Sequence, residues 1–125
     1  MFNSQWLDIA IGVVLVWFLF ALAVSAAIYE RCRVLVAPDS GAAHLAAAVG
    51  TPSVRLYGPA PASVYGPWPE RPDQRVLVSD GLACVPCGDL EAPPCGAVAS
   101  PACMLALGPA EVTHAVTDLL RAARA

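Results

Sequence analysis

Residues 33–44, with the sequence RVLVAPDSGAAH, decide the fold of this 125-residue chain. The apolar run from Arg33 to Ala37 ends at a proline, which is typical of a strand buried on both faces of a parallel sheet. An Asp-Ser-Gly turn follows, and then an alanine-rich stretch, residues 42–49, which stops at Gly50 and predicts a short helix. The segment therefore predicts a strand, a tight loop and a helix in that order.

The same alternation continues along the chain. Ser53–Tyr57 (SVRLY) and Arg75–Ser79 (RVLVS) are short apolar runs bounded by turn residues, and they predict two further strands. A last helix is expected to begin at Gly108-Pro109, after which apolar residues recur at helical spacing. Strands that alternate with helices in this way predict an α/β fold.

The amino-terminal segment is of a different kind. Residues 9–28 carry no charge, and at 1.5 Å per residue such a helix covers the roughly 30 Å of a hydrocarbon core. This predicts one transmembrane helix over about residues 9–28. The alternative is a secretory signal peptide, for which the small residues Ser25 and Ala26 would suit cleavage. Because nothing basic precedes the apolar run and Asp8 borders it, the membrane anchor is favoured.

Charges and prolines mark the boundary between the two parts. Arg31 and Arg33 directly follow the apolar span, so the positive-inside rule places the remainder of the chain in the cytoplasm. All twelve prolines lie after residue 37. The sequence thus predicts a membrane-anchoring segment over residues 1–32 and a globular domain over residues 33–125, in a single-pass membrane protein.

Composition excludes several classes of function. The chain is 58% hydrophobic and 14% charged, against about 25% charged residues in an average soluble domain. Its seven basic residues are all arginine and mostly scattered, which argues against a nucleic-acid partner. The absence of lysine excludes a catalytic Schiff base.

The turn after the first strand carries the most informative chemistry. A helix that starts directly after a strand presents unpaired amides and the positive end of its dipole, which together suit a phosphate group. Gly41 and Ala42 would supply such amides, Ser40 a hydroxyl, and His44 a side chain one turn further on. The alternative is structural: Asp39 or Ser40 could simply cap the helix, and His44 could be a packed residue.

Residues 34–67, VLVAPDSGAAHLAAAVGTPSVRLYGPAPASVYGP, resemble the donor-binding segment of glycosyltransferase family 9, the ADP-heptose:lipopolysaccharide heptosyltransferases and their relatives. The family pattern of Asp, Thr or Ser, Gly, two variable residues and His-Leu-Ala-Ala-Ala occurs here from Asp39 onward. A Gly-x-Pro and a Gly-Pro then follow at Gly50 and Gly58. Ala42 departs from the pattern, because members often have proline or a larger apolar residue there. The resemblance covers about residues 33–125.

This resemblance implies the carboxy-terminal part of a GT-B fold, here a partial Rossmann-like domain preceded by one transmembrane helix. It implies a nucleotide-diphosphate sugar such as ADP-heptose as donor, and a cell-envelope polysaccharide such as lipopolysaccharide as acceptor, at a bacterial inner membrane. Ser40 and the amides of Gly41 and Ala42 would hold the diphosphate, His44 a phosphate oxygen, and Asp39 the sugar hydroxyls or the loop itself. Since helix amides would stabilise the leaving diphosphate, no metal or other cofactor is required.

The resemblance also implies that parts of such an enzyme are missing from this chain. The acceptor domain and the carboxylate that deprotonates the acceptor should precede residue 33, where the membrane helix stands instead. Residues 1–30 resemble the opening of a group of uncharacterised bacterial membrane proteins. We therefore expect a truncated enzyme without assigned catalytic residues, inactive by itself unless a second chain supplies the acceptor domain. The alternatives are an inactive membrane-anchored fragment and a small Cys-rich interaction module.

Four cysteines form a second candidate site in the predicted loop 84–103. Cys84, Cys87, Cys95 and Cys103 have the spacing C-x2-C-x7-C-x7-C, and four thiolates could bind a structural Zn²⁺ or pair as two disulfides. A cytoplasmic location would disfavour disulfides. Free thiols are the third alternative, and for Cys32, beside the membrane span, a free thiol is preferred over lipidation.

Overall fold

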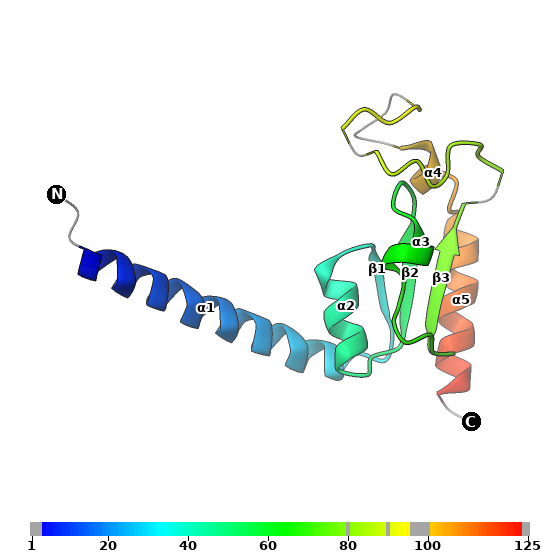
Figure 1. Ribbon diagram of the computed structural model, residues 1–125. Helices are drawn as coiled ribbons and strands as arrows, with labels where there is room; N and C mark the ends of the chain where they lie inside the picture. The colour runs from blue at the N-terminus through cyan, green and yellow to red at the C-terminus, as the bar shows by residue number, and fades with distance from the viewer. Residues whose placement is uncertain (1–3, 80, 90, 96–100, 124–125) are drawn as a thin grey trace.

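The computed structural model describes residues 4–79, 81–89, 91–95 and 101–123, and its centre is a sheet of three parallel strands (Figure 1). In chain order the elements are α1 (Ser4–Glu30), β1 (Leu35–Pro38), α2 (Gly41–Ala48), β2 (Ser53–Tyr57), α3 (Ala62–Tyr65), β3 (Gln74–Val78), α4 (Ala102–Leu105) and α5 (Pro109–Ala122). The predicted α/β class is confirmed, and each of the three predicted strands is present within two residues of its expected bounds.

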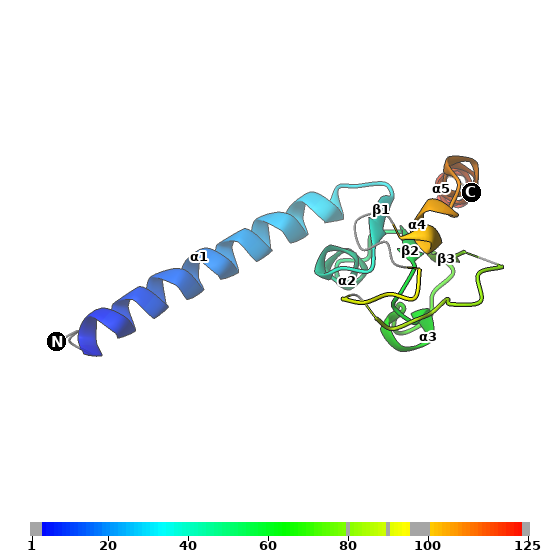
Figure 2. The ribbon, with the colours of Figure 1, turned by 90° about the horizontal axis from the view of Figure 1, so that it is seen from above.

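Strand β2 lies at the centre of the sheet, because the strand order is β1-β2-β3. Val54 of β2 is in register with Val36 of β1 and with Arg75 of β3. Helix α2 covers one face of the sheet and α5 the other (Figure 2). The core between these layers is therefore built around β2; its buried residues include Ala43, Ala46, Val54, Tyr57 and Leu119.

The expectation that the first strand is buried on both faces is wrong. Ala37 is buried under α2, but Val36 on the opposite face is 45% exposed. The reason is the position of α5, which packs on β2 and does not extend over β1. An apolar run alone does not reveal which faces of a strand a distant helix will cover.

Both outer strands leave an open edge. Within the described residues, β1 and β3 each pair with β2 only. Unpaired N–H and C=O groups at a sheet edge can accept a further strand. The described part of the sheet thus has two open edges.

Helix α1 extends away from the sheet as a long arm (Figures 1 and 2). Its 27 residues include a stretch with a mean hydropathy of 2.7, and the helix is long and apolar enough to cross a membrane. It begins five residues before the predicted span and ends two residues after it. The predicted apolar helix is confirmed, and it is compatible with a single-pass membrane anchor.

The carboxy-terminal end of α1 is joined to the domain by packing. Its residues 4–24 are all exposed, whereas Ser25, Ala26 and Tyr29 are partly buried where α1 contacts α2. The hydroxyl of Thr51 donates a hydrogen bond of 2.7 Å to the carbonyl oxygen of Tyr29. The arm is therefore attached to the sheet at its last turns as well as through the chain connection.

Two helices of four residues, α3 and α4, were not predicted, since they are too short to show helical periodicity. Helix α4 contains Cys103, which is buried and packs above the end of β2. A Cβ added to Gly58 would lie 2.8 Å from the sulfur of Cys103. Gly58 is therefore needed for the close approach of α4, and Cys103 lies in a helix instead of the predicted irregular loop.

Candidate donor-binding site

The amino terminus of α2 presents unpaired polar groups beside the carboxyl end of β1. Ser40 is the N-cap residue with extended backbone angles (φ −161°, ψ 161°), and its side chain makes no capping hydrogen bond. Within the described part of the chain, the amides of Gly41 and Ala42 also make no hydrogen bond. One hydroxyl and two amides are thus available at the positive end of the helix dipole. Such a combination suits an anion.

Gly41 is not required by the local backbone. Its φ lies outside the left-handed region, and a Cβ built on it would meet no atom within 4 Å. The absence of a side chain therefore leaves open space at the helix terminus, which a ligand could use.

Asp39 and His44 face one another across this terminus. The Nε2 atom of His44 lies 3.7 Å from Oδ1 of Asp39, and about half of the His44 side chain is exposed. When the imidazole is protonated, the two side chains form an ion pair at the edge of the site. His44 is therefore not a packed core residue, which was the structural alternative for it.

Tyr57 lies at the end of β2, close to Asp39. Its side chain is fully buried, and the hydroxyl donates a hydrogen bond of 2.6 Å to the carbonyl oxygen of Tyr65. Burial raises the pKa of the Tyr57 phenol; the guanidinium of Arg55 opposes this, and the carboxylate of Asp39 adds to it. Tyr57 thus joins the sheet to α3 and places a phenol between an acidic and a basic side chain.

A cavity of about 370 Å³ adjoins Asp39. It lies beyond the carboxyl ends of β1 and β2, the place where ligands bind in open α/β sheets. The amide of Gly88 donates a hydrogen bond of 2.8 Å to the carbonyl oxygen of Pro59, which holds the Cys-rich segment against this end of the sheet. The cavity is lined by Asp39, Ala60, Pro61, Val64, Tyr65 and Gly88.

The family model for glycosyltransferase family 9 (heptosyltransferase) matches residues 20–93, which is more than half of the chain. The chain belongs to glycosyltransferase family 9. Searches of curated proteins and of solved structures gave no match. At the level of the family, the chain is a heptosyltransferase-like glycosyltransferase, and membership implies a nucleotide-sugar donor.

The family 9 match includes the whole amino terminus of α2 with its candidate residues. It begins at residue 20, inside α1, so the turns of α1 that pack on α2 are matched together with the sheet. It ends at residue 93, ahead of Cys95 and Cys103. The likeness to family 9 is therefore carried by the sheet and the donor-site elements and not by the complete cysteine set.

The four cysteines differ in their surroundings. Cys103 is buried, Cys84 and Cys87 are partly exposed, and Cys95 is exposed. The free thiols include Cys32, Cys84, Cys87 and Cys103. Across the residues with described positions, no three His, Cys, Asp or Glu side chains come together as a metal site. Part of the predicted loop, residues 90 and 96–100, lies outside the described residues. A structural zinc site in this family 9 chain stays a prediction.

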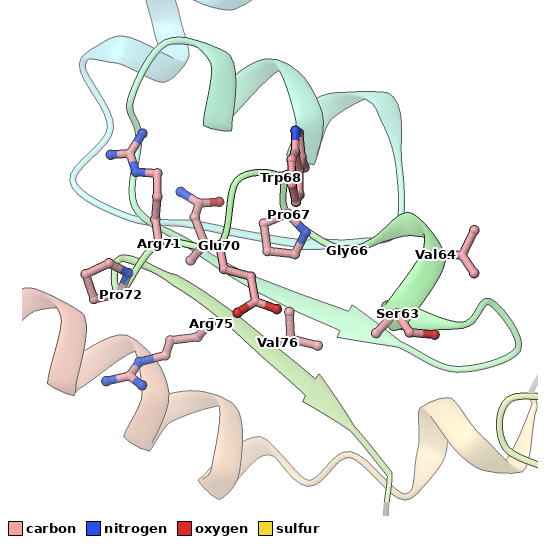
Figure 3. A pocket seen from close by; sticks show the side chains of 12 residues that line it. Ser63, Val64, Gly66, Pro67, Trp68, Glu70, Arg71, Pro72, Arg75 and Val76 are labelled. Atoms are coloured by element: carbon pink, nitrogen blue, oxygen red, sulfur yellow. The ribbon is translucent and has the colours of Figure 1, made fainter.

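A larger groove, of about 940 Å³, runs along β3 and contains none of the predicted site residues (Figure 3). The proline-rich stretch between α3 and β3 forms one wall, from which Trp68, Glu70 and Arg71 project. Trp68 is 91% exposed, and Arg71 pairs with Asp73 at 2.6 Å. Because this groove lies beside the strand and not at its carboxyl end, the smaller cavity is the better candidate for the donor.

Two residues next to the site, Arg55 and Tyr57, were not among the predicted site residues. Both lie on the face of β2 that α2 covers, and both are fully buried. A signal was present: an arginine at the centre of the apolar run SVRLY, in a strand expected to be buried, has to be accommodated inside the protein.

Proposed function

We propose that this chain binds the diphosphate of a nucleotide-diphosphate sugar, such as ADP-heptose, at the amino terminus of α2. The bound sugar would be transferred to a cell-envelope polysaccharide acceptor such as lipopolysaccharide, at the cytoplasmic face of a bacterial inner membrane. The observation that carries the proposal is the unused hydrogen-bonding capacity at this terminus, where the hydroxyl of Ser40 makes no cap.

Each predicted residue has a role in this scheme. The Ser40 hydroxyl and the amides of Gly41 and Ala42 donate hydrogen bonds to diphosphate oxygens, and His44 donates one from its exposed ring. Asp39 lines the adjoining cavity and would bind the sugar hydroxyls. Negative charge grows on the diphosphate as the glycosidic bond breaks, and amides fixed at a helix terminus stabilise that charge without a metal ion.

We also propose that a second polypeptide supplies the acceptor domain and the carboxylate base, so that the chain does not transfer sugar alone. Support comes from the sheet, whose outer strands β1 and β3 both have unpaired edges within the described residues. An added strand or domain would cover these edges.

Calorimetric titration of ADP-heptose into the full chain in nanodiscs tests the donor site. We expect His44→Ala to weaken binding, because it removes a ring from the edge of the site, and His114→Ala to leave it unchanged. His114 is a matched control, since it is an exposed histidine on α5 that pairs with Asp118 at 3.2 Å. Equal affinities of the wild type and His44→Ala would contradict the proposed role of His44, and the absence of wild-type binding would contradict the donor site altogether.

A further inference from the structure

Arg55 is a buried cation whose hydrogen-bond partners are all neutral. Its side chain is 0% exposed at the centre of β2. One terminal nitrogen donates to the carbonyl oxygen of Ala43 at 3.0 Å and to Oε1 of Gln74 at 3.2 Å, and Nε donates to Oγ of Ser53 at 3.4 Å. The other terminal nitrogen, Nη1, is buried without a hydrogen-bond partner.

Within the described residues, no carboxylate lies within 4.0 Å of this guanidinium. The carboxylate of Asp39 acts on the phenol of Tyr57 together with the guanidinium of Arg55, so Asp39 compensates the buried charge in part, across that phenol. Its carboxylate faces His44. A buried charge without a counter-ion in direct contact is strongly unfavourable, and the positive charge of Arg55 is therefore only partly compensated.

The polar network around Arg55 includes two hydrogen bonds that do not involve its guanidinium. Gln74 accepts a 2.6 Å hydrogen bond from the Ser53 hydroxyl and donates a 2.9 Å hydrogen bond to the carbonyl oxygen of Thr51. These two hydrogen bonds already link the starts of β2 and β3.

This partly compensated charge lies directly under the candidate donor site. Ala43, which accepts the hydrogen bond from Arg55, is in the first turn of α2, and its own amide bonds to the carbonyl oxygen of Ser40. The positive end of the helix dipole and the buried guanidinium therefore occupy the same region, where they repel one another. An anion at this terminus would be attracted by both, and because the guanidinium is buried, water and salt screen its attraction less than that of a surface charge.

We propose that Arg55 is a positioning residue for the diphosphate, raising the affinity of the α2 terminus for polyanions through its buried charge and without contacting the ligand. This inference rests on the proposed function. The buried charge of Arg55 would then make the site prefer a diphosphate over groups of lower charge.

Titration of inorganic pyrophosphate into the full chain in nanodiscs tests the inference independently of the nucleotide base. We expect Arg55→Gln to raise the Kd about tenfold and to weaken its salt dependence, because one positive charge is lost. Arg55→Lys, which keeps the charge, should restore the Kd to within about threefold of the wild type. Arg75→Gln is the matched control, since it removes an exposed arginine from the neighbouring strand, and it should leave the Kd unchanged.

The outcomes separate this inference from the proposed function. Absence of pyrophosphate binding by the wild type overturns the donor site itself. Wild-type binding with an unchanged Kd in Arg55→Gln, or an equal loss in the Gln and Lys variants, overturns the role of the buried charge. If Arg55→Gln does not fold, the ¹⁵N-labelled wild type is used: the Nε–H signal of Arg55, identified by its slow hydrogen exchange, should shift on addition of pyrophosphate. An unshifted signal overturns the proposal.

Discussion

Replacing Ser40 by alanine separates ligand binding from helix capping. A serine whose hydroxyl caps a helix contributes about 1 kcal/mol to stability. The Ser40 side chain makes no such hydrogen bond, so we expect Ser40→Ala to lower the free energy of unfolding by less than about 0.5 kcal/mol. A hydrogen bond to a charged group contributes roughly 1.5–3 kcal/mol. The same substitution should therefore weaken ADP binding about 10- to 150-fold.

Two measurements on the full chain in nanodiscs check this prediction. Calorimetry gives the Kd for ADP, and denaturation followed by circular dichroism gives the free energy of unfolding. Ser63→Ala is a suitable control, because Ser63 is an exposed serine on α3, and it should change neither quantity. A loss of about 1 kcal/mol in stability with an unchanged Kd for ADP would refute the reasoning, since Ser40 would then act as a cap.

Three further predictions concern the fold around the site. Gly58→Ala should destabilise the domain by about 1–3 kcal/mol, because the new Cβ would lie 2.8 Å from the sulfur of Cys103; urea denaturation measures this. Thr51→Val removes the hydrogen bond to Tyr29, so trypsin should cleave the α1–β1 connection faster. Burial raises the pKa of Tyr57 above its ordinary value of 10.0, so the folded state holds the phenol proton more tightly than the unfolded state does. The resulting contribution to the free energy of unfolding is complete below pH 10.0 and is lost as the pH rises through the folded-state pKa. Denaturation measured between about pH 9 and 11 would show this loss.

Each of these predictions has a control. Gly41→Ala, whose Cβ meets no atom within 4 Å, should leave the stability nearly unchanged, and an equal loss in both glycine variants would contradict the packing argument. Thr113→Val removes a hydroxyl that bonds within α5, and it should not alter tryptic cleavage next to α1. Tyr57→Phe should flatten the alkaline loss of stability. An unchanged pH profile in that variant would assign the loss to other groups.

The strands and helix α2 could be predicted because short apolar runs are separated by proline and glycine. The position of residues 39–44, in a tight turn and the first turn of a helix, was likewise predictable, whereas their role in donor binding stays a prediction. What failed was the burial of Val36, which depends on where a helix far along the chain packs. Cys103 was grouped with other cysteines by spacing alone, although its burial depends on α4 packing on Gly58.

Arg55 shows a different kind of limit. Apolar periodicity assigned its strand correctly but contains no information on how a charge at the centre of that strand is accommodated. Two of the three hydrogen-bond partners of its guanidinium come from α2 and from β3, at positions 12 and 19 residues away in the chain. Such a network can be described only from the folded chain, in which α2, the connection between the parallel strands β1 and β2, packs on β2.

The candidate membrane span of α1 and its contact with α2 meet in the same turns. The predicted membrane span, residues 9–28, overlaps the family match, which begins at residue 20. Residues 9–24 alone would cover only about 24 Å at 1.5 Å per residue, less than the roughly 30 Å of a hydrocarbon core. If α1 crosses a membrane, its turn at residues 25–28 must therefore lie near the bilayer boundary, and α2, which packs on that turn, must lie there too. Because α2 runs across the axis of α1 (Figures 1 and 2), its amino terminus would then face along the membrane surface and not away from it.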